Sequence, residues 1–168
     1  PGDDALWEIQ EQGQKLLSTS GYKQYEVSAY SLNAQQCQHN INYWQFGDYL
    51  GIGAGAHGKI TLAAEGQILR TNKTRQPQNY LARTGQAAGQ QKAIPRDELA
   101  IEFMMNALRL RDGVPTSYFT SRTGLAQSSI AQQVASLQSQ GLLDSDNHRY
   151  RATPLGYQFL NSLLQGFS

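Results

Sequence analysis

Apolar residues recur at helical spacing over the first twenty positions, which predicts an amphipathic helix. Asp3 or Asp4 can cap its start, and Ser20-Gly21 can end it. The alternating run 22–30 then predicts a strand, with Tyr25, Val27 and Ala29 on one side and Glu26 and Ser28 on the other. A helix and one strand cannot bury both faces of that strand. We therefore expect this unit to pack on the later segments of the chain or to be loosely held.

Two strand-like runs come next, at 59–62 and 68–73, and the intervening Gly66 predicts a hairpin turn between them. Residues 84–93 are small, polar and contain glycine, which is typical of a linker. The sequence thus predicts a region 1–83, a linker 84–93 and a second region 94–168.

The second region has the pattern of three helices and a two-stranded wing. Helices are predicted at 96–110, 115–122 and 128–140. Strands at 142–144 and 148–152 form a hairpin around Asp146-Asn147, and a last helix runs over 154–164. This order predicts a winged-helix-like domain.

A winged helix can bind DNA through its third helix, but residues 128–140 contain no lysine or arginine. Groove-binding helices need cations for phosphates, and they use arginine to read guanine. We therefore expect no nucleic-acid partner, and packing against the first region is the preferred role for this domain.

Composition argues against several classes of protein. Fourteen basic and thirteen acidic side chains give a net charge of +1, which argues against a general polyanion binder. No apolar run approaches the ~20 residues that cross a bilayer. The single cysteine excludes an intrachain disulfide and fits a reducing compartment. We expect a cytoplasmic protein without a membrane segment.

The chemistry is concentrated in two neighbouring motifs, His39-Asn40-x-x-Tyr43-Trp44 and the glycine-rich run 51–58. Imidazole is a common ligand of haem iron, and flat aromatic rings suit a flat macrocycle. Glycines allow a ligand to approach the backbone closely. Together they predict a binding site.

These two motifs, with the preceding run 21–28, resemble one family in order and spacing. It is the radical-SAM proteins related to oxygen-independent coproporphyrinogen III oxidase, and the His-Asn-x-x-Tyr-Trp motif resembles the haem-chaperone branch. The resemblance implies a protein that binds haem and passes it to acceptor proteins. One alternative is the oxidase itself, which decarboxylates coproporphyrinogen III. The other is a protein-interaction module.

The resemblance also implies the fold class, which is α+β. The first region would be the closing β/α unit and hairpin of a partial TIM-like radical-SAM barrel, followed by the winged-helix-like domain. The family holds a [4Fe–4S] cluster through three cysteines, and this chain has only Cys37. The chain opens at Pro1 and has no initiator methionine. We expect a C-terminal fragment, inactive alone, with S-adenosylmethionine and the cluster bound only by the full-length protein.

Four residues form the predicted haem site: His39, Asn40, Tyr43 and Trp44. His39 is the metal ligand, donating a ring nitrogen to haem iron, and its alternative role is an ordinary loop hydrogen bond. Tyr43 and Trp44 flank the porphyrin or simply cover the core. Asn40 orients His39 or ties down the local turn. On a helix, the four residues would form two pairs.

Five residues are implied by the resemblance to line the S-adenosylmethionine pocket: Ser28, Ala29, Tyr30, Ala56 and His57. The glycines around the last two can also mark a close crossing of two strands, and both roles are compatible. The run 51–58 lacks the helix and distal acid of a dinucleotide fingerprint.

The remaining candidate residues each have a simpler structural role as an alternative. Cys37 is a possible second iron ligand, but a free cysteine is preferred. Arg70, Lys73 and Arg75 could meet haem propionates, although a solvated strand face is the preferred role. Glu26 could act in acid–base chemistry only if it is buried.

Overall fold

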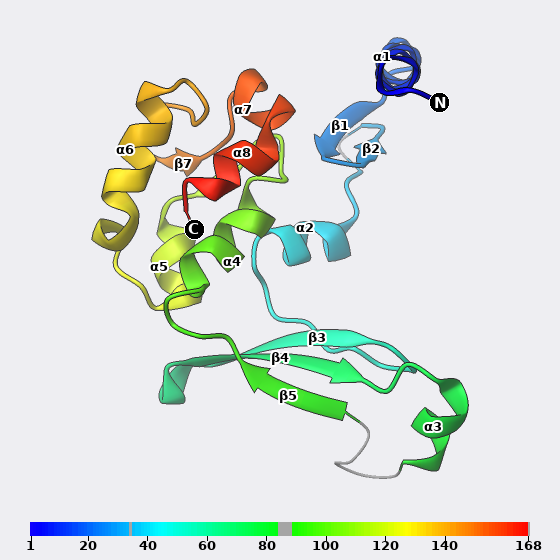
Figure 1. Cartoon of the computed structure of the whole chain (residues 1–168), viewed down its shortest axis with the longest axis vertical. Helices are drawn as coiled ribbons and strands as arrows, with labels where there is room; N and C mark the ends of the chain where they lie inside the picture. The colour runs from blue at the N-terminus through cyan, green and yellow to red at the C-terminus, as the bar shows by residue number, and fades with distance from the viewer. Residues whose placement is uncertain (34, 84–88, 168) are drawn as a thin grey trace.

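The computed structural model describes residues 1–33, 35–83 and 89–167 (Figure 1). The predicted first helix is confirmed as α1 (Asp3–Thr19), but its N-cap is Gly2 and no side chain caps it. The acidic caps were therefore predicted wrongly. Asp3 and Asp4 instead lie in the first turn, where carboxylates interact favourably with the helix dipole. No residue of α1 is buried, so its apolar face is open.

The strand predicted over 22–30 is wrong in one respect, because it is broken by a turn. β1 (Lys23–Glu26) and β2 (Ala29–Ser31) form an antiparallel hairpin in which Lys23 pairs with Ser31. The side-chain amide of Gln24 donates to the Val27 carbonyl at 2.9 Å and stabilises the turn. Alternation of residue types did not reveal this reversal.

The middle of the chain forms α2 (Gln38–Trp44) and a three-stranded antiparallel sheet of β3 (His57–Leu62), β4 (Gln67–Lys73) and β5 (Gly89–Ala93). The predicted hairpin is confirmed, with η1 (Ala63–Glu65) and the left-handed Gly66 at its turn. β4 leads through α3 (Pro77–Ala82) towards β5.

The predicted linker 84–93 is wrong over its second half. Residues 89–93 are β5, which pairs with β4 from Lys73 opposite Gly89 to Leu69 opposite Ala93. Residues 84–88 of that prediction lie outside the described residues. Small polar residues suit a linker, but backbone pairing on a sheet edge does not require apolar side chains.

The predicted helices of the C-terminal part occur in order, but the predicted hairpin of 142–144 and 148–152 is wrong in its extent, because residues 149–150 pair with 114–115 instead. The elements of this part are α4 (Leu99–Ala107), β6 (Val114–Pro115), α5 (Ser117–Thr123), η3 (Gln127–Ile130), α6 (Ala131–Ser139), β7 (Arg149–Tyr150), α7 (Pro154–Gln158) and α8 (Leu160–Gln165). β7 pairs with β6, and Leu143 bridges Ala152. The last predicted helix is interrupted at Phe159, whose φ of −110° and ψ of 43° separate α7 from α8.

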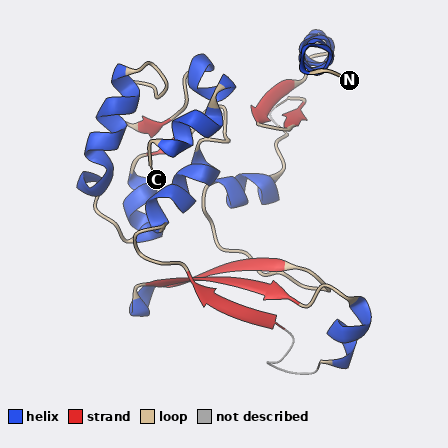
Figure 2. Ribbon diagram, in the orientation of Figure 1, coloured by secondary structure: helices blue, strands red, loops and turns tan. Residues whose placement is uncertain are grey.

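A row of edge-to-face aromatic rings forms the centre of the core. Phe46 contacts Phe103 at 5.7 Å, Phe103 contacts Phe119 at 5.4 Å, and Phe119 contacts Tyr150 at 6.2 Å between ring centroids. Phe46 comes from the segment after α2, whereas the other rings belong to α4, α5 and β7. Figure 2 shows α2 beside the C-terminal helices. The core therefore extends across the two regions that the sequence divides.

Helices and antiparallel sheets occur together, so the predicted α+β class is confirmed at that level. Within the described ranges, no helix is both long and apolar enough to cross a membrane.

Candidate functional site

α2 carries all four residues of the His-Asn-x-x-Tyr-Trp motif. The helix begins after Cys37, whose carbonyl accepts the Ile41 N–H at 3.0 Å. It ends where Phe46 adopts a left-handed φ of 60° and Gly47 lies against Asn42. A Cβ at Gly47 would lie 2.1 Å from Asn42 Oδ1, so the close approach requires glycine.

His39 is exposed on α2, and Tyr43 lies one turn further along the same face. An exposed imidazole is accessible to an iron atom that arrives from solvent. Such a group can act as a neutral ligand through either ring nitrogen. The geometry is thus compatible with the predicted ligand role of His39.

Asn40 has a partner other than His39. Its side-chain amide donates to the Tyr25 hydroxyl at 3.2 Å and joins α2 to β1. Of the two roles that the sequence left open, anchoring of the local structure is the one for which the structure contains a contact. Asn40 therefore positions the helix that presents the motif.

Three aromatic rings form a cluster beside the helix. Tyr43 and Trp44 are 4.7 Å apart at 86°, and Tyr43 and Tyr49 are 5.0 Å apart at 52°. Burial raises the pKa of the Tyr49 hydroxyl, and the neighbouring Tyr43 raises it further. The half-buried rings provide an apolar surface with polar edges, which suits a flat macrocycle.

Arg70 is paired within the chain. Its guanidinium lies 2.5 Å from the Glu102 carboxylate and donates to the Tyr49 hydroxyl at 3.2 Å. Burial alone lowers the pKa of Arg70, but Glu102 more than offsets this and raises it. The preferred interpretation of Arg70 as part of a solvated strand face is therefore wrong, since it links β4 to α4. Lys73 is half-buried and Arg75 is exposed.

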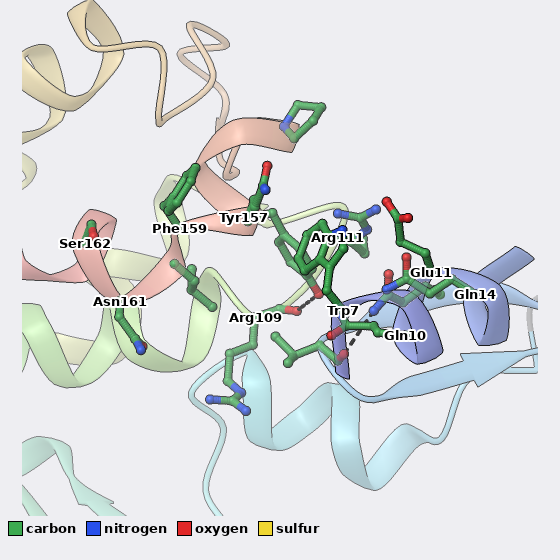
Figure 3. A pocket seen from close by; sticks show the side chains of 15 residues that line it. Trp7, Gln10, Glu11, Gln14, Arg109, Arg111, Tyr157, Phe159, Asn161 and Ser162 are labelled. Atoms are coloured by element: carbon green, nitrogen blue, oxygen red, sulfur yellow. Dashed lines mark hydrogen bonds between the residues drawn. The ribbon is translucent and has the colours of Figure 1, made fainter. Parts of the chain in front are cut away.

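Arg109 is a residue of this site that sequence reasoning missed. Its guanidinium carbon lies 4.7 Å from the centre of the Trp44 ring. Figure 3 shows its side chain turned towards α2. Arginine stacks favourably on an indole face. The only signal in the sequence was a basic residue near the end of the predicted helix 96–110, which gives no indication of a contact with residue 44.

The glycine-rich run packs against the end of the β3–β4 hairpin. Gly55 N–H donates to Thr74 O at 2.9 Å, and Lys73 N–H donates to Ala56 O at 2.8 Å. A Cβ at Gly51 would lie 2.1 Å from the His57 carbonyl oxygen. These contacts match the predicted close crossing of backbone segments.

The five residues predicted to line a cofactor pocket fall into two groups. Ser28 lies in the turn between β1 and β2, and Ala29 and Tyr30 lie on β2. Ala56 precedes β3, and His57 is its first, exposed residue. Figure 1 shows β2 and β3 on opposite sides of α2, so the strands that carry the two groups lie apart.

A buried ion pair anchors the segment between α2 and β3. Lys59 is 2% exposed, and its ammonium group lies 2.7 Å from Asp48 Oδ1 and 4.3 Å from the centre of the Phe46 ring. Asp48 also accepts the N–H and hydroxyl of Thr61 at 2.8 Å each. Burial lowers the pKa of Lys59. Burial raises that of Asp48, but the hydrogen bonds from Lys59 and Thr61 lower it overall.

Two further candidates can now be placed. Cys37 is an exposed free thiol directly before α2. Glu26 is buried, and its Oε2 has no hydrogen-bond partner among the described residues. No group of three or more His, Cys, Asp and Glu side chains gathers as a metal site in the described part of the chain.

A cavity of about 700 Å³ lies between α1 and the C-terminal helices (Figure 3). Trp7 on α1, Tyr157 on α7 and Arg111 contribute to its wall, and the Arg111 guanidinium lies 4.2 Å from the centre of the Tyr157 ring. The cavity is adjacent to the motif through Arg109, which also lines it.

The chain is similar in sequence to several known proteins, of which it spans less than half the length. Residues 94–159 match the family model described as the HemN C-terminal domain. The chain is 46% identical to the heme chaperone HemW of Escherichia coli over 99% of its own length and 43% of that protein. It is 45% identical to HemW of Haemophilus influenzae with the same coverage.

The chain is also similar to two proteins of lower sequence identity. The chain is 30% identical over 98% of its length to the mitochondrial radical S-adenosyl methionine domain-containing protein 1 of Bos taurus, of which it spans 39%. It shares its fold with coproporphyrinogen III oxidase (HemN) from Escherichia coli, described as a radical SAM enzyme, with a TM-score of 0.67 at 15% identity. That match covers 99% of this chain and 42% of HemN.

Proposed function

We propose that this chain, a relative of the radical-SAM haem chaperones along nearly its whole length, forms part of a protein that binds haem and passes it to acceptor proteins. The chain spans 43% of those chaperones, so the activity proposed here is that of the longer protein. Haem is the cargo of this protein and is bound reversibly.

The observation that carries the proposal is the position of His39. Its imidazole is exposed on a short helix, one turn before Tyr43, whose ring contacts those of Trp44 and Tyr49. An accessible ligand next to an open, largely apolar cluster of rings can hold haem and still release it to a partner, whereas a closed pocket would retain it. His39 is proposed to bind the iron, and Tyr43 and Trp44 to contact the porphyrin.

Two other functions make different predictions. An oxidase acting on coproporphyrinogen III would turn over that substrate in the longer protein. An interaction module would keep every activity when His39 is replaced. Haem binding without turnover of the porphyrinogen supports the chaperone over both.

The finer fold assignment is also a proposal. α1 and β1 would contribute to a radical-SAM barrel, which is supported by the shared fold with HemN. Residues 94–168 would form the winged-helix-like domain, supported by the β6–β7 pair and the Leu143–Ala152 bridge, and by a family match that begins at residue 94. Because Phe46 enters the core beside Phe103, the two regions would act as one unit.

The cofactors of the longer relatives are assigned on the same basis. One cysteine cannot supply the three thiolates of a [4Fe–4S] site, so the cluster and S-adenosylmethionine are assigned to the part of the relatives that this chain does not span. Ser28 to Tyr30 and Ala56-His57 remain proposed neighbours of S-adenosylmethionine, which would contact the two separate groups from different sides. A reducing cytoplasm is proposed from the single, exposed Cys37.

A haem titration tests the iron ligand. Wild-type chain should bind ferric haem with a shifted Soret band, and His39→Ala should lose that shift and weaken binding by about tenfold or more, since a metal–imidazole bond is lost. His148→Ala removes another exposed imidazole from the wing region and should behave as wild type. Identical spectra and affinities for wild type and His39→Ala would remove the ligand assignment.

A further inference from the structure

Two buried N–H donors, one in the motif and one beside it, have no acceptor in the described part of the chain. Trp44 Nε1 and Arg109 Nε are each inaccessible to solvent and lack a hydrogen-bond partner among the described residues. They belong to side chains that stack on each other, with 4.7 Å between the guanidinium carbon and the indole centre. An unpartnered buried donor costs free energy, and two in contact indicate an acceptor that is yet to bind.

The position of Arg109 is fixed by its surroundings. The Tyr157 hydroxyl donates to the Arg109 carbonyl at 3.0 Å (Figure 3). The Arg111 N–H donates to the Tyr25 carbonyl at 3.0 Å, and Tyr25 in turn accepts from Asn40 of the motif. The backbone that carries Arg109 is thus held from α7 on one side and from β1 on the other.

Arg109 also carries a positive charge without a direct carboxylate partner. Within the described residues, the ion pairs join Lys59 to Asp48, Arg70 to Glu102 and Arg151 to Asp144. The other cation near the aromatic cluster, Arg70, is therefore already paired. Arg109 is the cation at the Trp44 ring that can accept a new anion.

We propose that Arg109, together with the indole N–H of Trp44, binds a carboxylate of the porphyrin, a role that rests on the proposed function. The planar guanidinium fork matches a carboxylate, and the indole N–H of the stacked Trp44 is a further donor. The porphyrin propionates are carboxylates attached to a flat apolar ring, which fits beside the cluster of Tyr43, Trp44 and Tyr49. Arg109 would then select porphyrins whose propionates are free acids.

The test uses iron-free protoporphyrin IX, so it does not depend on the iron ligand. Fluorescence titration of the wild-type chain should give about tenfold tighter binding of the diacid than of the dimethyl ester, because a charge-assisted hydrogen bond is lost on esterification. Arg109→Gln should abolish this preference and leave ester binding unchanged. Arg122→Gln is the matched control, since Arg122 stacks 4.3 Å from the centre of the Tyr118 ring elsewhere in the fold.

The outcomes separate the proposed carboxylate site at Arg109 from the proposed haem binding through His39. A diacid preference that persists in Arg109→Gln, or that is absent from the wild type, would overturn the carboxylate site and leave the His39 titration to decide haem binding. Loss of the preference in Arg109→Gln supports it even if His39→Ala binds haem normally. If Arg109→Gln fails to fold, Trp44→Phe keeps a ring and removes the N–H, and it should reduce the preference, whereas an unchanged preference would count against the proposal.

Discussion

Neighbouring side chains of α2 have different roles at the residue scale. His39 is open to solvent, while Asn40 is bonded to Tyr25 and Trp44 is stacked on Arg109. The residue types were readable from the sequence, because imidazole, aromatic rings and carboxamide occur at helical spacing. The partners were not, since Tyr25 and Arg109 are distant along the chain and meet α2 only in the folded state.

The contribution of the Lys59–Asp48 ion pair to stability can be tested by substitution. Asp48→Asn leaves the buried ammonium of Lys59 without its counter-charge. This substitution should lower the free energy of unfolding by about 1–3 kcal/mol. The loss is smaller than for a fully buried ion pair, because Asp48 is half exposed and solvent screens its charge. Lys59→Met removes the buried charge and keeps an unbranched apolar chain, so its effect should be smaller. Urea unfolding at neutral pH measures both, and equal stability of Asp48→Asn and wild type would contradict the assigned role.

The pH dependence of that difference is set by the lowered pKa of Asp48. A carboxyl group whose folded pKa lies below its unfolded value of 3.8 contributes stability above pH 3.8 and loses it as the pH falls through the folded pKa. The gap in unfolding free energy between wild type and Asp48→Asn should therefore narrow in acid. A gap that stays constant from neutral pH into acid would show that the charge of Asp48 is not responsible.

At the element scale, helices with an apolar stripe could be predicted from the sequence, whereas elements that depend on backbone pairing could not. Helices with apolar stripes, such as α4 and α6, were predicted because side-chain periodicity reflects the buried face. The β1–β2 turn and β5 were missed, because both depend on backbone pairing. β5 is a mostly exposed edge strand of small and polar residues, so no apolar alternation marks it.

Substitution of two glycines tests the close backbone crossing before β3. In Gly51→Ala the new Cβ would lie 2.1 Å from the His57 carbonyl oxygen, so the segment before β3 must move and stability should fall by about 1–3 kcal/mol. Gly13→Ala in α1 meets nothing within 4 Å and should raise helix content, because alanine is favoured over glycine by up to about 1 kcal/mol. Thermal unfolding followed by circular dichroism distinguishes them, and a neutral Gly51→Ala would contradict the close crossing.

At the scale of the whole molecule, the segment that carries the His-Asn-x-x-Tyr-Trp motif is in contact with the C-terminal core. Phe46 comes shortly after α2 and packs on Phe103, and Arg109 extends from the segment after α4 to Trp44. The sequence divided the chain at 84–93 because composition changes there, whereas shared burial across that boundary is a property of the packed core.

The bond between His39 and haem iron is the central claim, and pulsed electron paramagnetic resonance of the ferric-haem-loaded chain tests it most directly. With the three histidines labelled with ¹⁵N, the wild type and His148→Ala should show an imidazole nitrogen coupled to the iron, and His39→Ala should lack that coupling. The same imidazole coupling in His39→Ala as in the wild type, or no imidazole coupling in either, would contradict it.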